Sequence, residues 1–237
     1  MEINIDQIVY WEWEFIKLNA TLVYSWAVMV VLVSVSWFVS RDLTEGTGIS
    51  RKQALIESLV VVIQKQIEET TQEKTDRYLP FIGTLFLFIL VSNLISVIPG
   101  VYSPTASLST TAALAISVFV AVPIFGITSR GVKSYFHNYV KPTPLMLPFN
   151  IIGELSRTLA LAVRLFGNIM SGSLIVAILL SLSPLFFPVV MQAFGLLIGV
   201  IQAYVFAILA LVYIASASRI HNTEETDSTE IINPQSK

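Results

Sequence analysis

Two long apolar stretches in the second half of the chain constrain its fold more than any other feature. They run from Leu145 to Leu182 and from Leu185 to Ala217, and Pro184 lies between them. The hydrocarbon core of a bilayer is about 30 Å thick and needs about 20 apolar residues to be crossed, whereas a helix of either length would measure roughly 50 Å. We therefore expect two long helices that tilt steeply or break within a membrane.

Three shorter apolar segments have the length of single membrane spans. They are Leu22 to Val39, about Leu79 to Ile98, and about Thr111 to Ile127, the last with a kink expected at Pro123. Only 13% of the residues are charged and 54% are hydrophobic, whereas about a quarter of a typical soluble domain is charged. The sequence predicts an all-α integral membrane protein with about five transmembrane helices, the last two long and steeply tilted.

An amphipathic segment separates the first two spans. Between Ile49 and Thr70 the apolar side chains recur at helical spacing, which predicts a helix on the membrane surface. Two interpretations stay open, namely a connector that rests on the bilayer and a docking site for another protein. The apolar face consists of Leu55, Leu59, Val62 and Ile63.

The basic residues predict the orientation of the chain. Lys and Arg cluster after the first span and after the third, while the loop from Pro99 to Thr110 carries no charge. Cytoplasmic loops carry an excess of Lys and Arg, so we expect the N-terminus outside and the C-terminus in the cytoplasm. The acidic N-terminus does not resemble a secretory signal, and the first span is expected to be retained. We divide the chain into an extracytoplasmic segment 1–21, a membrane domain 22–219 and a polar, disordered cytoplasmic tail 220–237.

Polar and charged residues interrupt the first long stretch at helical spacing. A charge at the centre of a membrane helix costs about 2.5 to 3.5 kcal/mol even on the lenient insertion scale, so such residues indicate a function. Their spacing places them on one face of a helix, which must be wet or face a partner. This polar stripe consists of Asn150, Glu154, Arg157, Arg164 and Asn168.

The two arginines of the stripe differ in their local neighbours. Glu154 and Arg157 are three residues apart and either neutralise one another or take part in function. Arg164 has no acid one turn away in either direction. Because the membrane segments contain no further acid, a carboxylate on another subunit is the natural partner of Arg164.

Two polar residues of the last span lie on one face, about three turns apart. They are Gln202 and Tyr213, and isolated residues of these types commonly link helices in membranes. If the two long helices form an antiparallel hairpin, Arg164 and Gln202 lie at similar distances from the turn. We expect the two residues at similar depth.

Several classes of site are excluded. The chain has no Cys and only two His, His137 and His221, so we expect no disulfide and no metal site. It contains no Walker A sequence and no glycine-rich loop after a strand. We expect no cofactor, no directly bound nucleotide, no nucleic-acid partner and no catalytic site of its own.

The block RLFGN, Arg164 to Asn168, resembles subunit a of the membrane sector of F-type ATP synthases. The similarity extends from about Tyr78 to Tyr213. Four blocks carry it in order: FLFILVSNLISVIPG, PTASLSTTAALAI, SRTLALAVRLFGNIMSG and IQAYVFAILALVYI.

The resemblance implies a stator element beside a rotating ring of c subunits, each with a membrane-buried carboxylate. Two aqueous half-channels reach the ring, and the matching arginine, Arg164, separates them and is essential for ion translocation. The other implied partners are the peripheral stalk b subunits, further ATP synthase subunits and the lipid bilayer. A guanidinium suits this role because it stays charged when desolvated, whereas lysine readily loses its proton.

The resemblance also assigns the ion path and the residues that face the ring. Gln202 matches the glutamine that faces the arginine, Asn168 the asparagine one turn beyond it, Asn93 the asparagine of the second helix, and Tyr213 the tyrosine of the last. The full set is Gln202, Asn168, Glu154, Asn150, Arg157, Ser173, Tyr213 and Asn93.

Some positions depart from the common family pattern. Ser173 stands where an acid is frequent, Gly195 where some members have histidine, and Asn150 where an acid is common. Ser107 and Ser109 replace an Asp and an Asn. A route lined by hydroxyls and amides suits hydrated Na⁺ at least as well as H⁺, so both ions stay open and a divergent sodium-transporting type is an alternative.

Two other functions are compatible with a polytopic chain. A secondary transporter usually shows paired repeats and broken helices, neither of which is visible in the sequence. A purely structural membrane anchor would need no unpaired arginine. We favour a bacterial plasma membrane as the location, with thylakoid and archaeal membranes as alternatives.

Overall fold

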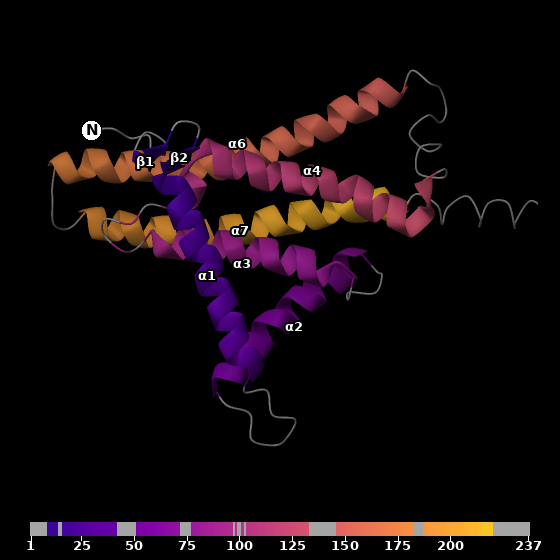
Figure 1. The fold of residues 1–237 in the computed structure, drawn as a ribbon, viewed down its shortest axis with the longest axis horizontal. Coiled ribbons are helices and arrows are strands. Elements are labelled where there is room, and N and C mark those ends of the chain that lie inside the picture. The colour runs from indigo at the N-terminus through magenta and orange to yellow at the C-terminus, as the bar shows by residue number, and fades with distance from the viewer. Residues whose placement is uncertain are drawn as a thin grey trace, which may run out of the picture.

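The structure is a computed structural model that describes residues 9–13, 16–41, 51–71, 77–96, 98, 101, 103–132, 146–182 and 187–219. Residues 1–8 and 220–237, which belong to the two predicted terminal segments, lie outside the described residues. The elements are drawn in Figure 1. In chain order they are β1 (Val9–Trp13), β2 (Ile16–Asn19), α1 (Ala20–Arg41), α2 (Arg51–Thr71), α3 (Leu79–Ile95), the 3-10 helix η3 (Pro104–Ala106), α4 (Leu108–Arg130), α6 (Met146–Leu182) and α7 (Phe187–Arg219).

The apolar helices confirm the predicted integral membrane protein. Four helices are long and apolar enough to cross a bilayer, namely α1, α4, α6 and α7, and α3 is a shorter apolar helix of 17 residues. The expected boundaries agree with these helices within a few residues, because membrane helices must satisfy their backbone hydrogen bonds internally over the whole apolar length. Apart from one short hairpin, the described part of the chain is therefore all-α, with five apolar helices.

The two long helices form an antiparallel pair. Helix α6 has 37 residues and α7 has 33, each of them continuous, and they pack against one another along the long axis of the molecule (Figure 1). The expectation of long helices is confirmed, and neither helix breaks within its described length. Their tilt in a bilayer stays a prediction.

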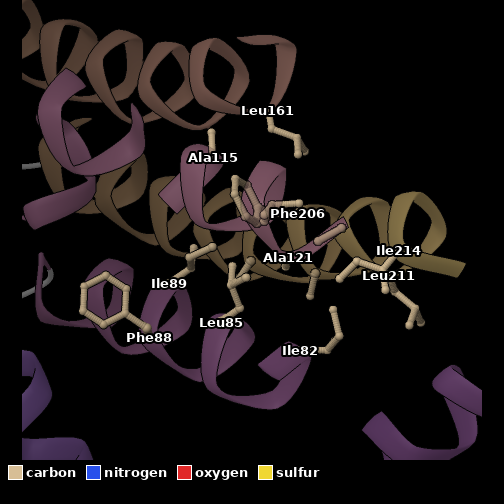
Figure 2. Close-up of a cluster of buried hydrophobic side chains, with 14 of the residues drawn as sticks. Ile82, Leu85, Phe88, Ile89, Ala115, Ala121, Leu161, Phe206, Leu211 and Ile214 are labelled. Carbon is tan, nitrogen blue, oxygen red and sulfur yellow. The ribbon is translucent and has the colours of Figure 1, made fainter. Parts of the chain in front are cut away.

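Helix α7 lies at the centre of the bundle, where α3, α4 and α6 all contact it. Figure 2 shows Phe206, Leu211 and Ile214 of α7 among buried side chains of α3, α4 and α6. Small buried residues, such as Ala203 and Ala210, let neighbouring helices approach α7 closely. The rotation of α7 about its axis is therefore determined by three neighbours.

Helix α2 occupies the predicted amphipathic segment. It packs against α3 and α7, and the Tyr204 hydroxyl of α7 donates a hydrogen bond of 2.8 Å to Oε1 of Gln66. Part of its surface thus docks on its own chain, as buried Ile67 also shows. The position of α2 on a bilayer stays a prediction.

A short hairpin precedes α1 and was not expected from the sequence. Strands β1 and β2 pair antiparallel, with Trp13 opposite Ile16 and an irregularity between Val9 and Trp11. The hairpin leads directly into α1 and carries none of the candidate site residues.

Candidate functional site

The Arg164 side chain is exposed on α6, beside the face that packs into the bundle. Leu161 and Leu165 on that packed face are fully buried, whereas the exposed side of the helix carries Leu159 and Val163. The polar stripe thus runs along the border between the packed face and an exposed apolar face. No hydrogen bond or ion pair joins Arg164 to any residue that the structure describes. An arginine in this position presents an unpaired charge to whatever covers α6.

One turn from Arg164, an amide pair joins α6 to α7. Nδ2 of Asn168 donates a hydrogen bond of 2.7 Å to Oε1 of Gln202, whose side chain is only 4% exposed. Nε2 of Gln202 is buried and has no hydrogen-bond partner among the described residues. Buried donors are nearly always satisfied, and an unsatisfied one is costly. The pair therefore leaves a donor free for a further partner close to the arginine.

Asn93 is not part of this pair and lies in the interface between α3 and α7. Its side chain is 3% exposed, its Nδ2 donates a hydrogen bond of 2.8 Å to the Gly199 carbonyl, and its Oδ1 accepts one of 2.7 Å from the Thr105 hydroxyl. Sequence reasoning missed Gly199 and Thr105 as partners. The available signal was the pair Gly195 and Gly199, four residues apart, which is typical of close helix contacts in membranes.

Arg157 and Tyr213 form a second link between α6 and α7, two turns from Arg164. The Arg157 guanidinium carbon lies 5.6 Å from the centre of the Tyr213 ring, within the range of a cation–π interaction. Sequence reasoning placed both residues in the ion path but did not pair them. The interaction restricts where the Arg157 charge can point.

The other candidate residues of α6 are not part of these contacts. Asn150 and Glu154 are half-buried, and the Glu154 carbonyl accepts a hydrogen bond from the Thr158 hydroxyl. Ser173 is exposed, and its hydroxyl donates to the Met170 carbonyl of its own helix. The structure thus brings together Asn168 with Gln202 and Arg157 with Tyr213.

Comparison with known proteins decides the family. Residues 22–215 match the model of a family described as ATP synthase A chain. The chain belongs to the ATP synthase A chain family. This assignment confirms the resemblance drawn from the RLFGN block, and the matched range contains every candidate site residue from Asn93 to Tyr213.

Individual members of the ATP synthase A chain family match almost end to end. The chain is 59% identical to ATP synthase subunit a 2 of Acaryochloris marina over 230 residues, 96% of this chain and 98% of the relative. It is 58% identical to ATP synthase subunit a 1 of Crocosphaera subtropica over 220 residues, 93% and 96% of the two chains. ATP synthase subunit a of Albidiferax ferrireducens is 56% identical over 219 residues, which are 92% of this chain and 95% of the relative. The fold and the family agree on a multi-pass membrane protein.

Proposed function

We propose that this chain is the stator ion-channel subunit of a rotary F-type ATP synthase. It would provide two access half-channels to a ring of c subunits, with Arg164 separating them and interacting with the carboxylate of the ring. The observation that carries the proposal is the exposed side chain of Arg164, which no described residue of the chain pairs and which borders an exposed apolar face of α6.

Electrostatics explains how such a site works. Two opposite charges attract far more strongly in a medium of low dielectric constant than in water, so the guanidinium would draw an ionised ring carboxylate toward it. The same positive charge opposes the direct passage of a cation between the two half-channels. A ring carboxylate would release its ion on approaching Arg164 and would take up another after leaving it.

The amide pair supports this role. A rotation of the Gln202 side chain would turn its buried Nε2 hydrogens, free of described partners, toward the ring carboxylate or toward water beside Arg164. A neutral amide donates a hydrogen bond without supplying a negative charge that would compete for the guanidinium. Arg164 would thus stay available to the ring.

The proposed assembly follows from the same role. The chain would contact the c-subunit ring, the peripheral stalk b subunits and other ATP synthase subunits, and would bind no nucleotide and perform no catalysis itself. It would lie in an energy-coupling membrane, for which we favour a bacterial plasma membrane, with the N-terminus outside and the C-terminus in the cytoplasm. The relatives named above all come from bacteria.

Reconstitution into vesicles with and without the c-ring tests the proposal. We expect ion conduction only when chain and ring are both present, since the ring carries the ion-binding carboxylate. Solute transport by the chain alone would instead indicate a secondary transporter, and full coupling after neutralisation of Arg164 would indicate a structural anchor. Either result contradicts the stator role.

The same vesicles identify the ion, which we propose to be H⁺ or Na⁺. Ser173, Gly195 and Asn150 stand where titratable groups are frequent in the family, so the access route lacks acids at these positions. Na⁺ transport would persist with a protonophore and cease with a Na⁺ ionophore. H⁺ transport would show the reverse pattern.

The contact between Arg157 and Tyr213 gives a further prediction. Replacing Tyr213 with Leu removes the aromatic ring and is expected to lower ATP-driven pumping about two- to fivefold, since a cation–π contact contributes about 0.5 to 1 kcal/mol at an exposed site. Tyr213→Phe is the matched control because it keeps the ring. Equal pumping rates of the Leu and Phe variants, measured per assembled complex, would show that the contact is irrelevant to transport.

A further inference from the structure

The closest approach between α3 and α7 occurs where Asn93 meets Gly199. A Cβ atom added at Gly199 would lie 2.9 Å from Cβ of Asn93 and 3.4 Å from its Cγ and Nδ2. Cβ atoms essentially never lie that close to a neighbour, so a larger residue at position 199 would force the two helices apart or turn one of them. By contrast, a Cβ atom added on the same basis would have no atom within 4 Å at Gly83, Gly131, Gly153, Gly167, Gly172 or Gly195.

Both ends of the Asn93 amide are held. Nδ2 donates to the Gly199 carbonyl, and Oδ1 accepts a hydrogen bond from the hydroxyl of Thr105, the middle residue of η3. The Thr105 hydroxyl lies 2.6 Å from that of Ser103, and Ser103 donates to the Ser92 carbonyl on α3. The side chains of Ser92, Asn93, Ser103 and Thr105 are all buried. The amide is thereby held between α3, the η3 segment and the backbone of α7.

This contact lies three residues before Gln202 on the same helix. Three residues of α-helix correspond to about 4.5 Å of rise and nearly one turn. A displacement or rotation of α7 at Gly199 therefore moves Gln202 by a similar amount. The hydrogen bond from Asn168 to Gln202 tolerates little movement, because hydrogen bonds weaken steeply with distance and angle.

We infer that Asn93, Thr105 and Gly199 form a positioning contact that sets the rotation and height of α7 and so presents Gln202 to Asn168 and to the ring beside Arg164. Asn93 then acts as a positioning residue and not as a member of the ion path. The inference rests on the proposed function, because it concerns the placement of Gln202 in that site.

Gly199→Ala tests the close approach in the assembled ATP synthase. We expect coupled ion transport per assembled complex to fall about tenfold, since misplacing a functional group by about 1 Å can lower a rate by about 100-fold. Gly83→Ala is the matched control because it adds the same methyl group to α3, where nothing lies within 4 Å. It is expected to transport at the wild-type rate.

The absence of Cys from the chain permits a direct readout of geometry. Cys residues introduced together at Asn168 and Gln202 are expected to cross-link efficiently with a short bifunctional thiol reagent. The yield should fall several-fold when Gly199→Ala is added, and should not change with Gly83→Ala. A merely structural role would lower the amount of assembled complex and leave the cross-linking yield per complex unchanged.

A pair of variants at Thr105 tests the hydrogen bond to Asn93. The pair also provides a second test of the inference if the complex with Gly199→Ala fails to assemble. Thr105→Val removes the hydroxyl at nearly constant volume, whereas Thr105→Ser keeps it. We expect Ser to retain the transport rate and cross-linking yield and Val to lose both. Equal behaviour of Val and Ser, or normal values for Gly199→Ala, would overturn the inference. Arg164→Ala in the same assay keeps the two questions apart, because its normal pumping would instead refute the proposed function.

Discussion

Replacing Arg164 with alanine is expected to abolish ATP-driven ion pumping while the complex still assembles. The side chain is exposed and joins no described residue through a hydrogen bond or ion pair, so its removal leaves the packing of α6 intact. It also removes an insertion cost of about 2.5 to 3.5 kcal/mol. What is lost is the fixed charge that, in the proposed function, would attract the ring carboxylate and keep the half-channels apart.

The measurement is ATP-driven ion uptake by inverted membrane vesicles, together with passive ion leak after ATP is withheld. Without the charge, uptake should vanish and leak through the membrane sector should rise. Arg164→Lys is the matched variant because it keeps a cation of similar reach. It should restore pumping only in part, since an ammonium is strongly hydrated, lacks the bidentate fork and loses its proton more readily when desolvated. Coupled pumping at the wild-type rate in Arg164→Ala would refute the proposed function.

The helices could be predicted from the sequence because lipid imposes a simple rule. An apolar run must be helical as far as the bilayer extends, and this rule located α6 and α7 to within a few residues of their observed ends. The hairpin of β1 and β2 was not predicted, because it precedes the first long apolar run and the rule does not apply to it.

The sequence predicted which polar residues share one face of α6, but not their contacts with other helices. Helical spacing identified the polar stripe of α6, since it depends on one helix alone. It did not reveal that Leu161, which lies between Arg157 and Arg164, faces the packed bundle, or that the Arg157 guanidinium lies over the Tyr213 ring. Those facts depend on how neighbouring helices are rotated, and that rotation is set by close contacts such as Asn93 with Gly199.

Gln202→Leu is expected to lower coupled pumping about 100-fold, the loss typical of removing one preorganised hydrogen-bond donor from a site where charge is stabilised. Leucine has a similar size and fits a buried position, so the packing of α7 should survive. It supplies neither the free Nε2 donor nor the Oε1 acceptor that holds Asn168. The amount of assembled complex should match that of the wild type.

A double-mutant cycle with Asn168→Leu separates the two functions of the glutamine. If Asn168 acts only by orienting Gln202 through the 2.7 Å hydrogen bond, the double variant should pump no worse than Gln202→Leu alone. If the two amides serve the ring independently, the two losses should multiply. The unpaired Nε2 lies on Gln202 and not on Asn168, so we expect the first result, with Asn168→Leu alone showing the smaller loss.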